Sequence, residues 1–142
     1  MTLLLADDDT DDRIFFKDAL DDLAVEAALL TVDDGVELMN FLHAEAAILP
    51  DLLFLDINMP RKNGFECLAE IKTHSKLREL PVIIFSTSLD RETADLLYDN
   101  GAQYFIRKPG DFTKLKKLIH EALELTSQPN PAQPPRNEFI LH

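Results

Sequence analysis

The sequence predicts an α/β fold built on an open, doubly wound parallel sheet. Five short apolar runs alternate with longer segments in which apolar residues recur every three or four positions. The apolar runs are 2–6, 28–32, 51–55, 81–85 and 103–107. Three of them are almost continuously apolar, as expected for parallel strands that have helices on both faces. Right-handed crossovers between such strands produce the doubly wound arrangement.

The segments between the runs have the pattern of helices with one apolar face each. The apolar positions are Phe15, Ala19 and Leu23, then Leu38, Leu42 and Ala46, and finally Phe112, Leu115, Ile119 and Leu123. Local signals agree with these helices: Asp34-Gly35 opens the second, Asn63-Gly64 opens the third and Asn100-Gly101 closes the fourth.

The length of 142 residues and the apolar content of 46% predict one folded domain. We expect this domain to cover residues 1–126. The tail, residues 127–142, contains four of the eight prolines and is expected to be extended and at least partly mobile. Its apolar end, Phe139-Ile140-Leu141, could dock on the domain or on a partner, but a frayed terminus is favoured.

Charge and hydropathy exclude several classes of partner. The net charge of −12 repels nucleic-acid phosphates, so no nucleic-acid partner is expected. No apolar run approaches the length of a membrane span, and the amino terminus lacks the features of a signal peptide, so we expect a cytoplasmic protein without membrane contact. The one cysteine, Cys67, falls in an apolar helical pattern and is expected to be buried, without a redox role.

Polar residues gather where the predicted strands end. The first strand leads into Asp7-Asp8-Asp9, the third into Asp56 and Asn58, the fourth into Ser86-Thr87-Ser88 and the fifth into Lys108-Pro109. Ligands of open parallel sheets bind at this edge. Carboxylates held together repel one another unless they bind protons or a hard cation such as Mg²⁺. A lysine and a hydroxyl could then bind phosphoryl oxygens while one carboxylate attacks, which predicts phosphoryl-transfer chemistry.

Each signal also has an ordinary structural explanation. The acids at 7–9 could be helix-capping residues, Lys108-Pro109 a solvated turn, and the hydroxyls at 86–88 a generic cap. Asp56 is harder to explain in this way, because a carboxylate directly after an apolar strand loses solvation unless it has a partner.

Over residues 1 to about 126 the chain resembles the receiver domain of two-component response regulators. The matching segments are 5–8, 55–60 with Asn63-Gly64, 81–86, Gly101-Ala102 and Lys108-Pro109. The spacings of 30 residues from Asp56 to Ser86 and 22 from Ser86 to Lys108 also fit. The resemblance implies a five-stranded, flavodoxin-like sheet with strand order 2-1-3-4-5.

The resemblance also implies roles for the acidic residues. Asp56 corresponds to the phosphoacceptor, which takes a phosphoryl group from a histidine kinase or a histidine phosphotransfer protein. The metal, Mg²⁺ or Mn²⁺, would be bound by Asp8 directly, by Asp7 through water, by Asp56 and by the backbone carbonyl of Asn58.

The remaining roles concern the phosphoryl group and the switch. Lys108 would bind the phosphoryl group, Ser86 would turn its hydroxyl toward it, and Phe105 would be the aromatic switch. The family more often has Thr at position 86 and Tyr at position 105. Because Thr87 follows Ser86, either hydroxyl could serve, and the strand pattern favours Ser86.

The implied function is that of a stand-alone response regulator that signals by protein–protein interaction. It would not be an enzyme, apart from self-catalysed phosphoryl transfer and slow autodephosphorylation. A symmetric dimer could form through the face of the fourth helix, fifth strand and fifth helix, with Asp95 and Asp99 opposite Arg107, Lys114 and Lys117 of a second copy. An ordinary solvated surface explains these charges equally well.

Three alternative functions fit these residues less well. A phosphohydrolase of the haloacid-dehalogenase type needs a second acid at position 58, where this chain has Asn, and a substrate-selecting cap. A flavin carrier would need a phosphate-binding loop where Asp7-Asp8-Asp9 repels phosphate. A degenerate receiver that is never phosphorylated should have lost Asp56, Asp8 or Lys108, and all three are present.

Overall fold

In the computed structural model, which describes residues 1–44, 48–129 and 131–142, strands and helices alternate along the chain. The elements are β1 (Thr2–Ala6), α1 (Thr10–Asp22), β2 (Ala28–Val32), α2 (Gly35–His43), β3 (Leu52–Leu55), α3 (Gly64–Thr73), β4 (Val82–Ser86), α4 (Arg91–Asp99), β5 (Tyr104–Arg107), α5 (Phe112–Leu125), a 3₁₀ turn (Arg136–Glu138) and β6 (Ile140–Leu141). The five predicted strands are confirmed to within one residue at each end.

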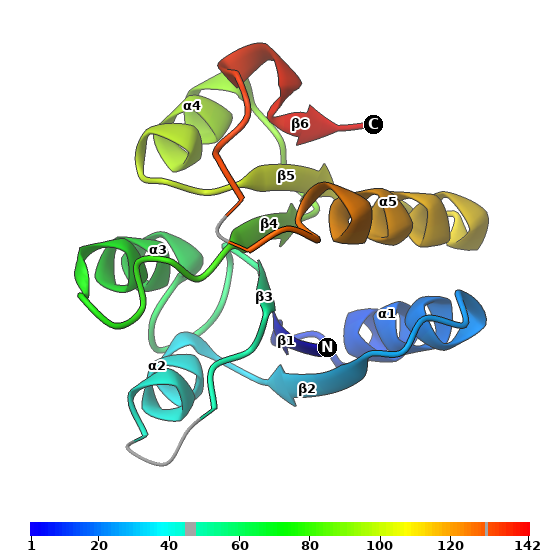
Figure 1. Cartoon of the computed structure of the whole chain (residues 1–142), viewed down its shortest axis with the longest axis horizontal. Coiled ribbons are helices and arrows are strands. Elements are labelled where there is room, and N and C mark those ends of the chain that lie inside the picture. Colours follow the sequence, from blue (N-terminus) through cyan, green and yellow to red (C-terminus); the bar gives the residue numbers. More distant parts are fainter. Residues whose placement is uncertain (45–47, 130) are drawn as a thin grey trace.

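All strand pairs are parallel, in the order β2-β1-β3-β4-β5-β6. Helices α1 and α5 cover one face of the sheet, and α2, α3 and α4 cover the other (Figure 1). This confirms the predicted α/β class and the order 2-1-3-4-5. The predicted strand count of five was too low, since β6 extends the sheet beyond β5.

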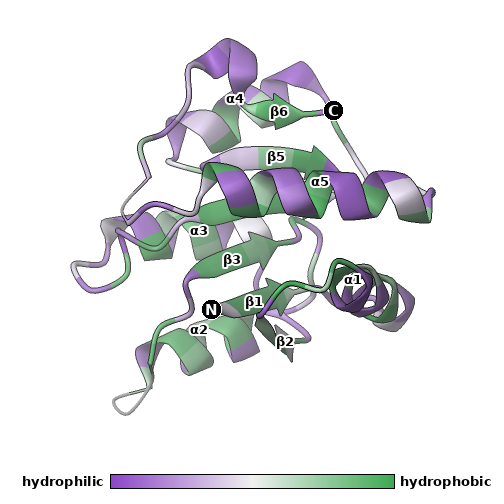
Figure 2. Ribbon diagram, turned by 45° about the vertical axis from the view of Figure 1, so that its right-hand side comes forward, coloured by the Kyte–Doolittle hydropathy of each residue, from purple (hydrophilic) through white to green (hydrophobic). Residues whose placement is uncertain are grey.

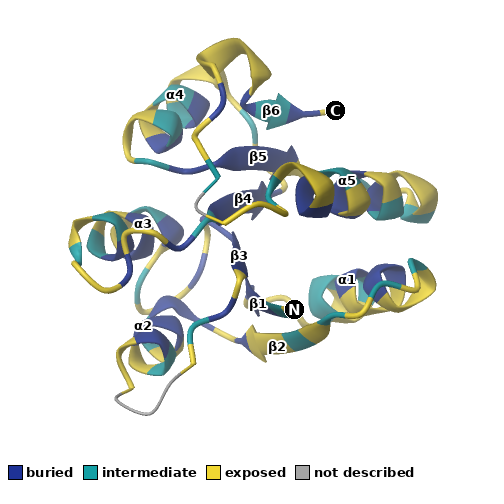
Figure 3. Cartoon of the chain, in the orientation of Figure 1, coloured by how far each residue is buried: buried dark blue, intermediate teal, exposed yellow. Residues whose placement is uncertain are grey.

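The central strands β1, β3 and β4 are apolar along almost their whole length because both of their faces are covered (Figures 2 and 3). Successive side chains alternate between two core clusters: Leu53 packs with the α2–α4 side, and Phe54 with the α1–α5 side. The rigid sheet that results fixes where each strand ends, and therefore where the residues after it lie.

The buried face of helix α1 is rotated from the predicted one, so that Ala19 is buried as predicted while Phe15 and Leu23 are only partly buried. The sequence pattern selected Phe15, Ala19 and Leu23, but the fully covered residues are Phe16, Ala19 and Leu20. Phe16 packs edge-on against Phe54 and Phe85, with ring centroids 4.9 and 5.4 Å away. This aromatic contact with β3 and β4 determines the rotation of the helix, and spacing alone does not reveal it.

The other predicted helix faces agree with the structure where it describes them. Leu38 and Leu42 of α2 are buried, as are Leu115, Ile119 and Leu123 of α5, while Phe112 is half-buried. Ala46 lies outside the described residues.

Helix α3 begins at a close backbone approach that shapes the loop after β3. Asn63 caps the helix, and its side chain and that of Glu66 form a reciprocal capping box. The Gly64 N–H donates to the carbonyl of Ile57 at 2.8 Å. A Cβ at position 64 would overlap the carbonyl oxygen of Asp56, so only glycine fits here without a shift. The tight approach fixes the backbone on the carboxyl side of Asp56.

The frayed carboxyl terminus that the sequence favoured was wrong for the last residues. Ile140–Leu141 pairs with β5 as strand β6, and only 2% of Phe139 is exposed. Without this strand, β5 would be an edge strand with unpaired backbone groups. The N–H of Phe105 instead donates to the carbonyl of Phe139 at 3.0 Å. The end of the tail thus places apolar residues at an otherwise open sheet edge.

Two further expectations concern Cys67 and the membrane. Cys67 is fully buried, as predicted, and burial raises the pKa of its thiol to about 11, so the unreactive thiol form prevails at neutral pH. Within the residues that the structure describes, none of the helices combines the length and apolar character needed to cross a bilayer.

Candidate functional site

The four sequence-predicted strand ends do meet at one edge of the sheet. Backbone hydrogen bonds continue past the strands and place the site residues: Asp56 N donates to Ala6 O at 2.9 Å, and Lys108 N donates to Ser86 O at 2.8 Å. Asp7 N likewise donates to Val32 O of β2 at 3.1 Å. The sheet itself thus holds the acids, the hydroxyl and the lysine in fixed relative positions.

Three of the predicted metal ligands form one group. Carboxylate oxygens of Asp7, Asp8 and Asp56 all lie within 4.8 Å of one another. Asp7 is fully buried and Asp56 is 5% exposed, whereas Asp8 is exposed and leaves the group open to solvent on one side. Such an open cluster of hard oxygen donors suits Mg²⁺ or Mn²⁺, which keep several waters and accept ligands from a substrate.

The buried Asp7 carboxylate supports this fit. Its Oδ1 accepts a hydrogen bond from Asp9 N at 3.0 Å. Its Oδ2 makes no well-aligned hydrogen bond to the described residues, and its charge is countered there by the Lys108 ammonium 2.8 Å away. A buried carboxylate oxygen that lacks a well-aligned hydrogen-bond donor is suited to bind a cation or a metal-bound water.

In the metal-free protein, the surroundings of Asp56 destabilise the charged form of its carboxylate. Burial raises its pKa from the ordinary 3.8 to about 6; the charge of Lys108 opposes this rise, and the nearby Asp7 charge adds to it. The Asp56 Oδ2 atom lies 3.2 Å from Lys108 Nζ, and Oδ1 accepts a long hydrogen bond of 3.4 Å from Asn58 N. A cation bound beside this carboxylate would favour its charged form.

Lys108 pairs with both buried carboxylates of the group, Asp7 and Asp56, and with Asp12 of helix α1. Its Nζ lies 2.8 Å from Asp7 Oδ2, 2.9 Å from Asp12 Oδ2 and 3.2 Å from Asp56 Oδ2, and only 8% of its side chain is exposed. Burial alone lowers the pKa of this amine, but the ion pairs with Asp7 and Asp12 outweigh burial, so the pKa is raised. The ammonium is therefore permanently charged beside Asp56.

Sequence reasoning missed Asp12. It lies in the first turn of α1, its N–H donates to the capping Asp9 at 3.1 Å, and its carboxylate faces Lys108. No motif marks it. The sequence position of Asp12 could have indicated its role. It lies three residues after the helix-capping position, in the first helical turn after β1, and a side chain there can reach back over the strand ends.

Asp9 itself has the ordinary role considered for the acidic run. It caps α1, whereas Asp7 and Asp8 belong to the carboxylate group. The capping explanation was therefore right for one acid of the three.

The two candidate switch hydroxyls differ in burial. Ser86 is fully buried at the end of β4, and Thr87 is exposed. Phe105 is fully buried on β5 and packs against Phe139 from the tail. Asn58 is exposed two residues after Asp56, and its role as a backbone metal ligand stays a prediction.

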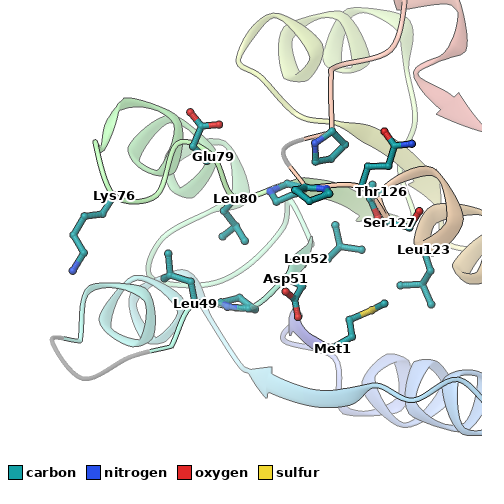
Figure 4. Close-up of a pocket in the computed structure, with 15 residues that line it drawn as sticks. Met1, Leu49, Asp51, Leu52, Lys76, Glu79, Leu80, Leu123, Thr126 and Ser127 are labelled. Carbon is teal, nitrogen blue, oxygen red and sulfur yellow. The ribbon is translucent and has the colours of Figure 1, made fainter.

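A separate cavity of about 550 Å³ lies near the opposite, amino-terminal ends of the strands (Figure 4). Its walls include Met1, Leu52, Leu80 and Leu123, and the carboxylate of Asp51 there already accepts the N–H of Thr2 at 2.7 Å. This mostly apolar hollow contributes no residue to the carboxylate site.

The fold and the site define an α/β domain with a metal-type carboxylate group and a buried lysine at its strand ends. The chain belongs to the response regulator receiver domain family, whose sequence profile matches residues 3–120. This family consists of phosphoacceptor signalling domains and not of conventional enzymes. The similarities give no support to the phosphohydrolase alternative.

Known relatives cover most of the chain. The response regulator Rcp1 of Synechocystis sp. is 29% identical over 121 residues, which are 82% of this chain and 82% of Rcp1. The structure of the phosphorylated cyanobacterial phytochrome response regulator RcpA matches with a TM-score of 0.81 and 32% identity, over 89% of this chain and 94% of RcpA. The Mn²⁺-bound form of Rcp1 matches with a TM-score of 0.77 and 27% identity, over 94% and 99% of the two chains.

Proposed function

We propose that this chain receives a phosphoryl group on Asp56, with Mg²⁺ or Mn²⁺ bound by Asp7, Asp8, Asp56 and the Asn58 carbonyl. The observation that carries the proposal is the position of the Lys108 ammonium, which contacts Asp56 and Asp7 at once beside the three-carboxylate group. The proposed receiver domain extends to about residue 126, where α5 ends.

The proposed reaction follows from these positions. A carboxylate oxygen of Asp56 attacks the phosphorus of a phosphohistidine or a small phosphoramidate, a phosphorus–oxygen bond forms, and the phosphorus–nitrogen bond breaks. The leaving nitrogen takes a proton, and Asp56 becomes an acyl phosphate. Lys108 binds one oxygen of the transferred phosphoryl group, and the Ser86 hydroxyl donates a hydrogen bond to a second oxygen of that group. A divalent ion, when bound, neutralises the developing charge on the phosphoryl oxygens.

The proposed partner upstream is a histidine kinase or a histidine phosphotransfer protein in the cytoplasm, and the output is binding to another protein. Phytochrome-type sensor kinases are the first candidates to test as phosphodonors, because RcpA and two further structural relatives, at 26% and 28% identity, are described as phytochrome or bacteriophytochrome response regulators. Mg²⁺ or Mn²⁺ is the proposed ion, since Rcp1 has been crystallised with Mn²⁺.

Phosphorylation by a small donor tests the proposal without a known kinase. Incubation with phosphoramidate and Mg²⁺ should add one phosphoryl group that is stable in acid and labile in base, as an acyl phosphate is. The Asp56→Asn variant should gain none. A wild-type protein that gains no phosphoryl group, or a variant that gains as much as the wild type, would contradict the proposal.

A further inference from the structure

The surface beside α4 and β5 is already occupied by the chain's own tail. We define the α4–β5 groove by Asp95, Tyr98, Asp99, Gln103 and Phe105. The tail runs from the end of α5 across to α4 and then turns into β6, so that two distant parts of the sequence lie together (Figure 1).

The first part of the tail is bound through its backbone carbonyls and through the side chain of Gln133. Gln103 Nε2 donates to Pro131 O at 2.9 Å, and Tyr98 Oη donates to Pro134 O at 2.6 Å. In the other direction, Gln133 Nε2 donates to Tyr98 O at 2.8 Å. Bonds from side chains to the carbonyls of a proline-rich segment recognise extended backbone and depend little on the side chains of that segment.

The next contact selects positive charge. Arg136 Nη1 lies 3.1 Å from Asp95 Oδ1, Arg136 Nη2 lies 2.5 Å from Asp99 Oδ1, and the guanidinium stacks 4.5 Å from the centre of the Tyr98 ring. A planar guanidinium satisfies both carboxylates and the ring together, which an ammonium cannot do. The sequence analysis considered these two acids for pairing with a second copy, and within this chain Arg136 pairs with both of them.

The last contact selects an aromatic residue followed by apolar ones. Phe139 packs edge-on against Tyr98 at 5.3 Å and against Phe105 at 6.3 Å. Ile140 then packs on the α4 side of the sheet and Leu141 on the α5 side, so the end of the tail is held on both faces. An arginine three residues before an aromatic anchor, followed by a short strand, is thus the pattern that the groove accommodates.

We propose that the α4–β5 groove is a binding site for a protein segment that has an arginine at the start of a 3₁₀ turn and an aromatic residue three positions later, and that residues 131–141 fill it as an internal ligand. A protein partner that presents such a segment must displace the tail. A cavity of about 560 Å³ lies beside the tail, with Leu89, Ala94 and Ile140 in its walls. A partner can make its first contact there before it displaces the tail. The proposal does not depend on phosphorylation of Asp56.

A labelled peptide with the sequence of residues 131–142 tests this proposal on the full chain. The Arg136→Glu/Phe139→Ala double variant should release its own tail and bind the peptide saturably, as measured by fluorescence anisotropy. The wild type should bind the peptide at least about ten-fold more weakly. In the wild type, only the small fraction of molecules whose own tail has left the groove can bind the peptide. Arg78→Glu, a change on an exposed arginine outside the groove, is the matched control and should behave as the wild type.

Four further measurements keep the outcomes distinct. A peptide with both changes should bind neither protein. The Phe105 amide, which donates to Phe139 O, should exchange its hydrogen faster in the double variant, and thermal melting shows whether that variant is folded. If a folded double variant binds no peptide, or if both proteins bind it equally, the proposal is overturned. A wild-type dimer in sedimentation that the double variant loses would also overturn it, since the tail would then fill the groove of a second copy.

Discussion

The Lys108 ammonium is shared between Asp56 and Asp12, an acid that lies outside the predicted metal ligands and phosphoacceptor. Asp12 Oδ2 is 2.9 Å from Lys108 Nζ, closer than the 3.2 Å to Asp56 Oδ2. When a phosphoryl group arrives, Lys108 must bind it while Asp12 still attracts the same charge. Asp12 is therefore a competitor for the cation that the proposed reaction uses.

Asp12→Asn should strengthen the binding of a phosphoryl mimic. Because the Asp12 side chain is one-third exposed, the ion pair contributes at most about 1 kcal/mol, so the affinity for beryllofluoride with Mg²⁺ should rise roughly two- to five-fold. Asp11→Asn removes an exposed acid from the same helical turn and should leave the affinity near that of the wild type. Equal effects of the two changes would mean that only net charge matters.

Asp8→Ala should weaken Mg²⁺ binding more than Asp9→Ala. Asp8 belongs to the carboxylate group, whereas Asp9 caps α1. The Asp9 change should instead lower the free energy of unfolding by about 1 kcal/mol, the usual contribution of a helix cap. Asp8→Ala should stabilise the metal-free fold, because it relieves repulsion among the acids. Calorimetric metal titration and urea denaturation separate the effects, and equal metal affinities would show that Asp8 is not a ligand.

The pKa of Asp56 predicts how stability responds to pH. Since burial raises this pKa from 3.8 to about 6, the folded protein holds the proton more tightly than the unfolded chain does. The stability that the protonated carboxyl confers is complete below about pH 4 and is lost as the pH rises through 6.

Asp56→Asn removes this titration. The variant should gain stability over the wild type between pH 4 and 6 in the absence of metal, by ~1.4 kcal/mol for each unit of raised pKa, and keep the advantage at higher pH. Urea denaturation at several pH values with a chelator present measures the difference. A difference that stays constant from pH 4 to 8 would show that the carboxyl has an ordinary pKa.

Gly64→Ala should disturb the loop that carries Asp56. An added Cβ meets the carbonyl of Asp56, which cannot move without shifting β3, so we expect a loss of about 1–3 kcal/mol in the free energy of unfolding and slower phosphorylation. Gly110→Ala is the matched control, because a Cβ there has no heavy atom within 4 Å. Comparable losses in the two variants would rule out the close approach as the cause.

Local patterns predicted the parts of the fold that depend on them. The parallel strands followed from apolar runs that need cover on both faces, and the convergence of Asp7, Asp56 and Lys108 followed from the shared edge at which parallel strands end. The resemblance to a known family supplied the roles of these residues, and the geometry brings them together as it implies.

The features that sequence reasoning missed depend on contacts between distant segments. The rotation of α1 is determined by the packing of Phe16 on Phe54 and Phe85, and the docking of the tail by Phe139 and Arg136 on α4 and β5. Proline-rich composition predicted an extended tail, but composition does not show whether a sheet edge is free to receive it. Asp12 escaped notice because its partner Lys108 is 96 residues away along the chain.

The central claim, that Asp56 is the phosphoacceptor, is tested most directly by reductive trapping. Borohydride reduces an aspartyl phosphate to homoserine, and fragmentation of the proteolytic peptides by mass spectrometry locates the converted residue. After treatment with phosphoramidate and Mg²⁺, homoserine should appear at position 56, and it should be absent when Mg²⁺ is chelated. Homoserine at another aspartate with position 56 unconverted, in a wild-type protein that has gained a phosphoryl group, would contradict the account.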